Sequence, residues 1–370
     1  MTKLRTVLLS AAHLAMDMTT VAFVYALIGM RGSGGAQTVQ SVSSLSVAGC
    51  VLAYDLLAFG LQPFIGAFAD LKRRAAPLLY FSLFGAGICA AACALCDFPQ
   101  GIGASSVALL VFFSLCNAVF HVSAGAFVIA ESEKKSAPLG IFVAPGAVGV
   151  AVGRLYGFSV LFAAGTILFV FGILLIFVRT KDGSLAPHFA RTDSLKAQTE
   201  ADLLPLLILA FAVFVRGFGG GAMPATYEAT DLLVLLAALL AALGKAAGGF
   251  LADAFGTKSV ALVCLPVSAC MLAFGGGVPA VYLIGTALFN TSMPVTLWLS
   301  FAALPRFRNT AFGVMACFLM LGSVLAMAVS VPRRAAFVLI LLSGAAIAAA
   351  PLLCKNKSCL SCGRKRGKIL

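Results

Sequence analysis

The sequence predicts an all-α polytopic membrane protein with twelve membrane-spanning helices. Hydrophobic residues make up 61% of the 370 residues, charged residues only 11%, and the mean hydropathy is +1.06. A soluble fold of this length could not bury so much apolar surface, so lipid must cover the rest. Apolar stretches of about 20 residues, the length that a helix needs to cross a bilayer, recur along the whole chain.

The expected spans form two groups of six, separated by a polar stretch. They cover residues 7–29, 45–69, 77–95, 105–130, 138–157 and 159–178, then 205–224, 232–252, 259–276, 279–303, 311–330 and 335–353. We therefore expect an N-terminal six-helix bundle (1–178), a cytoplasmic linker (179–204), a C-terminal six-helix bundle (205–353) and a basic tail (354–370). The first span follows Lys3 and Arg5 as a signal peptide would, but it is long and lacks a cleavage site, so we expect it to be retained.

The net charge of +13 indicates how the protein is oriented in the membrane. With both termini cytoplasmic, most lysines and arginines fall in the inner loops and tails, and only Arg31, Arg154, Arg333 and Arg334 fall outside. This asymmetry is the positive-inside bias of membrane proteins, and it argues against a nucleic-acid partner. We expect a monomer that crosses the inner or plasma membrane many times, surrounded by the lipid bilayer.

Most of the eleven cysteines lie inside apolar stretches, where cysteine behaves as a small hydrophobic residue. Cys354, Cys359 and Cys362 lie instead in the basic tail, where they could hold a metal or carry acyl chains. Their spacing lacks a fourth ligand or a histidine, so we expect no metal site. Binding of the basic tail to anionic lipid headgroups is the simpler interpretation.

A short motif occurs twice, half a chain apart. Gly66-Ala-Phe-Ala-Asp70 precedes two arginines, and Gly249-Phe-Leu-Ala-Asp253 precedes a glycine and a lysine. Each copy ends the second span of its half and begins a short cytoplasmic loop, as in transporters with duplicated halves. A helix stop with flanking charges is the alternative, but two accidental copies in register are not expected. The residues that we expect to gate the cytoplasmic side are Gly66, Asp70, Arg73, Arg74, Gly249, Asp253, Gly256 and Lys258.

Pseudo-symmetry between the halves predicts a partner for each aspartate. A carboxylate at the end of one helix can accept hydrogen bonds from the free N–H groups at the start of another, where the helix dipole is positive. Asp70 should meet the helix that starts near Asn309 to Phe312, and Gly66 would allow the two helices to approach closely. Asp253 should make the corresponding contact near Leu139.

The duplicated motif resembles the loops of the major facilitator superfamily between helices two and three and between helices eight and nine. The arrangement of six spans, a linker and six more agrees with that family over the whole chain. A closer resemblance, to the fosmidomycin-resistance-like branch, is carried by His13 and Asp17 in helix one, by Phe120-His121 in helix four and by the glycine-rich stretch 140–153 in helix five. The resemblance implies the major facilitator fold, a central site and antiport of drugs against protons.

Few ionisable residues lie inside the spans, and each is a functional candidate because such groups are costly in the membrane. They are His13, Asp17, Asp55, His121, Arg216 and Lys245. His13 and Asp17 are four residues apart on one helix face, where a carboxylate and an imidazole can share a proton. We expect Asp17 to couple transport to protons with the help of His13 and Asp55. A structural hydrogen bond to a neighbouring helix is the alternative.

Arg216 is the leading candidate for substrate binding, because its guanidinium can clamp a carboxylate or a phosphate. A structural ion pair with Asp17 or Asp55 is the alternative. Lys245 lies nearer the cytoplasmic end, where a lysine can extend to the surface, so we do not include it. The remaining expected substrate-binding residues, for which helix packing is an equal alternative, are His121, Asn117 and Asn290.

These observations predict a secondary active transporter that moves a small molecule by alternating access and is coupled to protons. The resemblance to drug–proton antiporters implies the efflux direction, which the residues themselves do not determine. The sequence has no Gly-x-x-x-x-Gly-Lys-Ser/Thr loop, so we expect neither ATP hydrolysis nor a cofactor. Three alternatives stay open: an organic-anion uptake carrier anchored by Arg216, a non-transporting sensor or scaffold with the same fold, and a membrane enzyme that uses His13 and Asp17.

Overall fold

A computed structural model of the chain describes residues 2–29, 44–99, 101–132, 135–178 and 202–354. Nearly all of the predicted linker and of the basic tail lies outside these residues, as do Arg31, Cys359 and Cys362. The described residues contain only helices and their connections, and no strand. Twelve helical segments are long and apolar enough to cross a membrane, so the predicted all-α polytopic fold is confirmed.

The helices of the N-terminal half are α1 (Thr2–Leu27), α2 (Ser44–Asp55), the π-helix η1 (Leu56–Gly60), α3 (Gln62–Lys72), α4 (Ala75–Leu95), α5 (Ala104–Glu131), α6 (Ala137–Tyr156) and α7 (Phe158–Phe177). Those of the C-terminal half are α8 (Leu203–Ala222), α9 (Asp231–Phe255), α10 (Thr257–Phe274), α11 (Pro279–Asn290), α12 (Ser292–Ala303), α13 (Arg308–Ala328) and α14 (Arg333–Leu353). The second span thus comprises α2, η1 and α3, and the tenth comprises α11 and α12.

Both interruptions are followed by a proline. Pro63 stands at the start of α3 and Pro294 in the first turn of α12. A proline has no N–H to donate to the carbonyl four residues earlier, so each removes one bond of the helix, to Phe59 and to Asn290 respectively. The regular α-helix of the second and tenth spans is therefore interrupted at mid-length.

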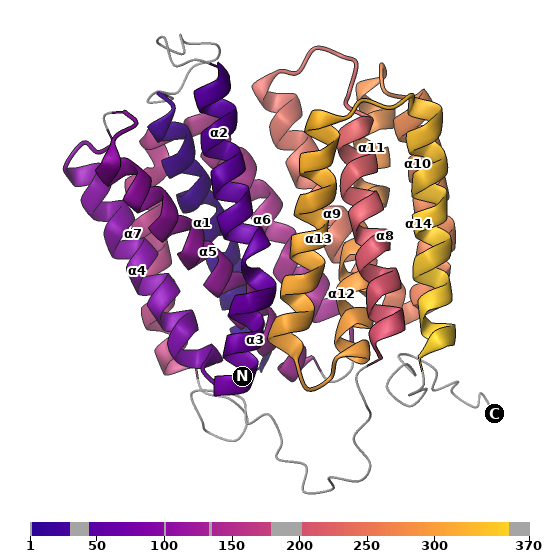
Figure 1. Cartoon of the computed structure of the whole chain (residues 1–370), viewed down its shortest axis with the longest axis horizontal. Coiled ribbons are helices and arrows are strands. Elements are labelled where there is room, and N and C mark those ends of the chain that lie inside the picture. Colours follow the sequence, from indigo (N-terminus) through magenta and orange to yellow (C-terminus); the bar gives the residue numbers. More distant parts are fainter. Residues whose placement is uncertain (1, 30–43, 100, 133–134, 179–201, 355–370) are drawn as a thin grey trace, which may run out of the picture.

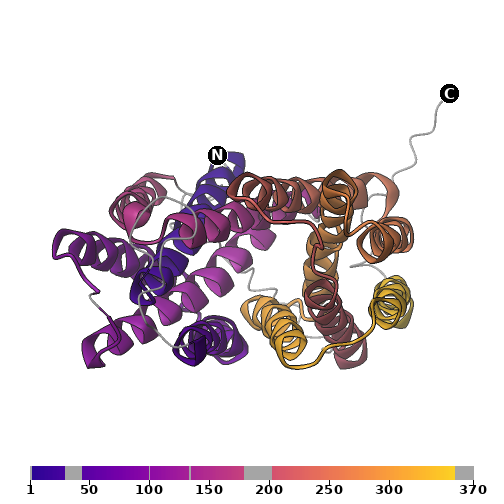
Figure 2. The same ribbon diagram turned by 90° about the horizontal axis from the view of Figure 1, so that it is seen from above.

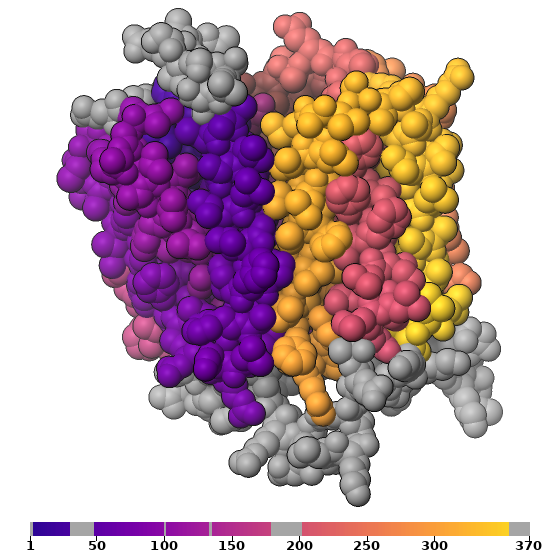
Figure 3. Space-filling model, in the orientation of Figure 1, coloured from indigo at the N-terminus to yellow at the C-terminus, as the bar shows by residue number. Residues whose placement is uncertain are grey.

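The two groups of six spans stand side by side. In Figure 1 the N-terminal half, from indigo to magenta, occupies one side and the C-terminal half, from red to yellow, the other, and Figure 2 shows the same division from above. In the space-filling view the two halves meet along a seam between the second and eleventh spans (Figure 3). We call the side that carries Val178 and Asp202, the described residues next to the linker, the linker side, and the opposite side the distal side.

Large apolar side chains cover much of the outer surface, as a lipid-facing surface requires. Phe64, Phe68, Leu95, Phe177 and Phe255 are each more than half exposed. The interior is filled by small residues and by aromatic rings, because helices in a membrane associate through close packing rather than through exclusion of water. Some of the buried polar residues, among them His13, Asp17, His121 and Arg216, lie next to the space between the halves.

Candidate functional site

A cavity of about 260 Å³ lies between the two halves, within the membrane-spanning region. Its walls come from α1, α2, η1, α5 and α6 of the N-terminal half and from α8, α9, α12 and α13 of the C-terminal half. Most of its lining side chains are apolar. The ionisable residues that line it are the ones that the sequence placed inside spans: His13, Asp17, Asp55, His121, Arg216 and Lys245.

Three of these residues, His13 and Asp17 of α1 and His121 of α5, form a buried cluster. The Nε2 atom of His13 lies 3.2 Å from Asp17 Oδ2 and 2.8 Å from Nε2 of His121. The Nε2 atom of His121 lies 3.5 Å from the other oxygen of the Asp17 carboxylate. Gly146 of α6 leaves room for this cluster, since a Cβ there would lie 2.5 Å from both His13 Nε2 and Asp17 Oδ2.

The hydrogen bonds of the two imidazole rings determine where their protons lie. The Nδ1 atom of His13 is 2.8 Å from the carbonyl oxygen of Phe142, and that of His121 is 2.9 Å from the carbonyl oxygen of Asn117. A carbonyl oxygen only accepts, so each Nδ1 carries a hydrogen, and a neutral ring then has only a lone pair at Nε2. Two lone pairs cannot bond across 2.8 Å. The contact between the Nε2 atoms is therefore favourable when one additional proton lies between the two rings, beside the Asp17 carboxylate.

A chain of polar groups holds Asp17 from behind. Asn117 donates from Nδ2 to Asp17 Oδ1 and to the hydroxyl of Thr20, both at 3.1 Å, and that hydroxyl lies 2.9 Å from the hydroxyl of Tyr54. Asn117 is fully buried and does not line the cavity. The structure therefore places Asn117 behind the carboxylate that it orients, rather than among the residues that a substrate in the cavity would touch.

Two cations, Arg216 of α8 and Lys245 of α9, lie on the opposite wall. Arg216 is only 4% exposed, and its Nη1 donates to the hydroxyl of Ser292 at 3.1 Å. Among the residues that the structure describes, neither cation forms an ion pair with a carboxylate. The alternative prediction, an ion pair between Arg216 and Asp17 or Asp55, is thus not met in this state of the protein.

A second pocket, of about 240 Å³, adjoins the cavity and shares both cations with it. No acidic side chain is among the residues that line this pocket. Asn290, which the sequence predicted to contact substrate, lines the second pocket and not the larger cavity. Its Nδ2 donates to the carbonyl oxygen of Thr286, one turn earlier in α11, at 2.9 Å.

Asp55 stands at the junction of α2 and η1, on the same side of the cavity as the histidines but apart from their cluster. Among the described residues it forms neither a hydrogen bond nor an ion pair. π-helical turns are rare and often occur at functional positions. The structure does not bring Asp55 together with His13 and Asp17, so any part that it takes in proton movement must be separate from theirs.

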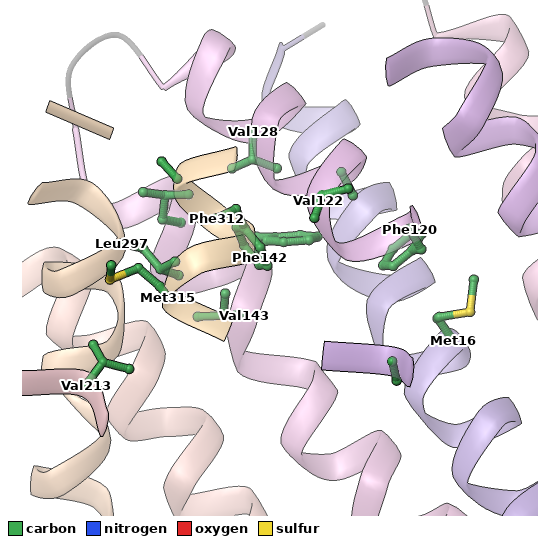
Figure 4. Close-up of a cluster of buried hydrophobic side chains, with 14 of the residues drawn as sticks. Met16, Phe120, Val122, Val128, Phe142, Val143, Val213, Leu297, Phe312 and Met315 are labelled. Carbon is green, nitrogen blue, oxygen red and sulfur yellow. The ribbon is translucent and has the colours of Figure 1, made fainter. Parts of the chain in front are cut away.

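Aromatic rings from both halves close the cavity toward the linker side. Phe312 of α13 packs against Phe142 of α6, with ring centroids 6.4 Å apart (Figure 4). It also packs against His121, with ring centroids 6.2 Å apart. Leu297 and Met315 of the C-terminal half lie together on one side of this contact (Figure 4). Because Phe142 also accepts the hydrogen bond from His13, this aromatic floor touches the histidine cluster directly.

Below this floor, Asp70 at the end of α3 contacts the start of α13. Its carboxylate accepts four hydrogen bonds: from the backbone N–H groups of Asn309 (3.2 Å) and Thr310 (2.9 Å), from the Asn309 amide (2.7 Å) and from the Thr310 hydroxyl (2.7 Å). A Cβ on Gly66 would lie 2.5 Å from the carbonyl oxygen of Asn309. The predicted position of this contact, at the start of the eleventh span, is confirmed.

The second copy of the motif makes the corresponding contact at the other seam, between α9 and α6. Asp253 accepts hydrogen bonds from the backbone N–H (2.7 Å) and hydroxyl (2.8 Å) of Ser136 and from the backbone N–H of Ala137 (3.0 Å). A Cβ on Gly249 would lie 2.8 Å from Ala137 Cα. The contact therefore lies at the start of α6, a few residues before the predicted position near Leu139.

The position three residues after each aspartate has a positive φ. Gly256 adopts +88°, and Arg73, its counterpart in the first copy, adopts +53°. Glycine reaches this region without a steric penalty, whereas arginine does so at a cost. Arg73, Arg74 and Lys258 are exposed at the linker side. The turn geometry of the motif is thus kept in both copies although only one has the glycine.

The arrangement of helices matches that of solved transporters. A major facilitator superfamily transporter, FucP, in its outward conformation aligns with 95% of this chain and 99% of its own, with a TM-score of 0.65 and 13% sequence identity. The chain has the fold of the major facilitator transporters. A variant of the E. coli fucose:proton symporter FucP aligns with 96% of this chain and 98% of its own, with a TM-score of 0.60 and 12% identity. Neither a protein-family model nor a curated protein matches the sequence.

Sequence reasoning missed several residues of this site. Lys245 lines both pockets, although its place in the sequence suggested a position near the surface. Ser292 and Phe312 carry no sequence signal of their own, because a serine and a phenylalanine are common in membrane helices. Gly146 lies in the glycine-rich stretch of helix five. That stretch could have predicted that a helix packs closely against the histidine cluster.

Proposed function

We propose that this protein is a secondary active transporter of the major facilitator superfamily, which moves a small molecule through the central cavity by alternating access and is coupled to protons. The fold and a cavity between two duplicated halves support this function, because substrate sites in such transporters lie at mid-membrane between the halves. The contacts of Asp70 and Asp253 close the linker side. Release of these contacts would open the cavity on that side.

The observation that carries the proton coupling is the cluster of His13, Asp17 and His121 on the cavity wall. Loss of the shared proton would leave two lone pairs and a carboxylate facing each other at the distances described above. The side chains would then have to separate. Since His13 also contacts Phe142, which packs against Phe312, the protonation state of the cluster is linked to the aromatic contact between the halves.

We propose that both termini and the linker face the cytoplasm in the inner or plasma membrane, as the distribution of basic residues indicates. The structure is then an outward-facing state. The resemblance of His13, Asp17 and His121 to the fosmidomycin-resistance-like branch favours exchange of a substrate against protons, which would produce efflux. Symport of the substrate with protons would instead produce uptake.

The test is transport by the purified protein in proteoliposomes. A screen for small molecules that raise the thermal stability of the protein supplies a substrate, because a ligand of the folded state stabilises it. We expect a proton gradient to drive accumulation of this substrate. We expect Asp17→Asn and His121→Gln to abolish accumulation against the substrate gradient while exchange of labelled for unlabelled substrate continues.

Asp231→Asn is the matched control, because Asp231 is an exposed carboxylate at the start of α9, on the distal side. That variant should transport like the unaltered protein. Full gradient-driven accumulation by Asp17→Asn would remove this carboxylate from the coupling mechanism. Conversion of the compound into a product, instead of its movement, would favour the membrane-enzyme alternative. The sign of the proton gradient that drives accumulation distinguishes symport from antiport.

A further inference from the structure

We infer that the ligand of this cavity is an amphipathic organic monoanion, with its charged group between Arg216 and Lys245 and its apolar part against the side chains of α12 and α13. The inference depends on the proposed function only for the statement that this ligand is the transported substrate. Binding of an anion at these residues can be measured without any transport.

The first step of the argument is that the wall of the C-terminal half carries positive charge that no carboxylate of the described residues contacts. The guanidinium of Arg216 has five N–H donors, and its hydrogen bond to Ser292 uses one of them. Arg216 is buried, Lys245 is half-buried, and both line the two pockets. No carboxylate pairs with either residue in the part of the chain that the structure describes. Buried charge without a partner is costly, so a bound anion would supply the missing interactions.

The second step concerns the room beside these cations. The pocket of about 240 Å³ that they share is lined in addition by the backbone of Gly217, Gly220 and Gly221 and by Asn290. Because liquid water takes about 30 Å³ per molecule, this pocket can hold a carboxylate, sulfonate or phosphonate group together with several waters. It contains no acidic side chain that would repel such a group.

The third step is the chemistry of the larger cavity, into which the rest of the ligand would extend. Beside the cations its surface is formed mostly by Met293, Leu297, Met315, Leu319 and Met320. The hydroxyl groups of Thr296 and Ser323, which also line it, already donate to backbone carbonyl oxygens of their own helices. Methionine side chains adapt to ligands of different shape, and none of these five residues can pair with a hydroxyl group. A sugar would therefore exchange many hydrogen bonds to water for few on this surface, whereas an apolar ring or chain would be bound well.

The fourth step restricts the ligand to one negative charge. The opposite wall presents Asp55, a carboxylate without an ion pair among the described residues, and Asp17 with its histidines. A second anionic group on the ligand would face Asp55 across the cavity and be repelled. Only the end of the ligand that lies at Arg216 and Lys245 can therefore be negative.

The experiment measures binding to the purified full chain in lipid nanodiscs. The probes are pairs of equal shape, benzoate with benzamide and 2-naphthoate with 2-naphthamide, together with inorganic phosphate and sulfate. We expect at least one carboxylate to bind at least about tenfold more tightly than its neutral amide, because the amide leaves Arg216 and Lys245 without an anionic partner. We expect the larger carboxylate to bind more tightly than benzoate, and the inorganic anions to bind more weakly than either.

Two substitutions assign the anion to these residues. Lys245→Gln should reduce carboxylate binding at least about tenfold and leave amide binding unchanged. Arg216→Lys keeps the charge but loses the planar fork, and it should also weaken the carboxylate selectively. Arg154→Gln is the matched control, because Arg154 is an exposed cation at the distal end of α6, outside both pockets. It should change the affinity less than about twofold, as expected for a screened surface charge.

The inference is overturned if no carboxylate binds more tightly than its amide, or if both substitutions leave the carboxylate preference intact. Equal affinity for phosphate and for 2-naphthoate would show that the site binds inorganic anions and does not recognise an apolar part of the ligand. These outcomes differ from failure of the proposed function. A protein that binds naphthoate through Lys245 but moves nothing in proteoliposomes would refute transport alone, and one that transports only neutral compounds would refute the anion alone.

Discussion

We expect Asp70→Asn to release one of the two contacts that hold the halves together on the linker side. The substitution keeps the size and shape of the side chain and replaces one carboxylate oxygen by an amide nitrogen, which donates. Each oxygen of Asp70 now accepts two hydrogen bonds, Oδ1 from Asn309 and Oδ2 from Thr310. Whichever oxygen is replaced, two donors lose their acceptor and the remaining bonds lose the help of the negative charge.

The magnitude follows from those bonds. A hydrogen bond to a charged group contributes about 1.5–3 kcal/mol, and partial exposure of Asp70 to solvent reduces this value. The Thr310 hydroxyl can turn to accept from a new amide, which recovers part of the loss. We therefore expect the closed linker side to be destabilised by about 1–3 kcal/mol, which changes the ratio of closed to open states by about 5-fold to 150-fold.

The assay is a distance measurement between spin labels on exposed residues of the two halves, Lys72 at the end of α3 and Lys258 at the start of α10, in a background without reactive cysteines. Asp70→Asn should shift the distribution toward longer distances, and Asp253→Asn should do the same through the other seam. Asp231→Asn, an exposed carboxylate on the distal side, should leave the distribution unchanged. Identical distributions in both seam variants and the unaltered protein would show that these motifs are only helix stops.

Three further predictions concern the histidine cluster, the α6–α9 seam and the orientation. The sequence has only three histidines, and one of them lies in the linker, so ¹⁵N-histidine NMR can resolve the cluster. We expect protonated Nδ1 atoms at His13 and His121 and one proton shared by their Nε2 atoms. Unprotonated Nδ1 atoms would refute the shared proton. Gly249→Val should open the linker side, because its Cβ alone would lie 2.8 Å from Ala137 Cα, and spin-label distances that match the unaltered protein would contradict this. Reporter fusions in the linker and at Leu370 should fluoresce in the cytoplasm, and a periplasmic signal from either would reverse the proposed topology.

The fold could be predicted from the sequence because the distribution of apolar residues along the chain largely determines it. Lipid accepts only helices of sufficient length and apolarity, so the hydropathy pattern gives the number of spans and their positions. The Asp70 contact could also be predicted, since a repeated motif and the symmetry between the halves together specify a partner. The break of the second span at Leu56–Gly60 was not predicted, because Pro63 alone does not tell whether a helix kinks, ends or widens to a π-helix.

The cavity could be predicted only in part. Ionisable residues inside spans were recognised by their cost in the membrane, and all of them line the cavity. Their pairing could not be read from the sequence, because it depends on how each helix is rotated about its own axis. This is why Asn117 proved to lie behind Asp17, and why Lys245, whose α9 packs tightly against α6 through Gly140, faces the cavity and not the surface.

The placement of opposite charges on opposite walls bears on what energy source can drive the protein. A proton held by the histidines adds one positive charge to the N-terminal wall, and a monoanion held by Arg216 adds one negative charge to the C-terminal wall. A carrier loaded with both therefore carries the same total charge as the empty one. A membrane voltage of 100 mV does work of about 2.3 kcal/mol on each charge that crosses the membrane. This work is zero when the charges of the transported ligands add up to zero. Symport of such a pair would be electroneutral, so its direction should follow the pH difference across the membrane and not a voltage imposed by a potassium gradient and valinomycin. Exchange of the anion against a proton would instead move two charges per cycle, so the imposed voltage should drive it.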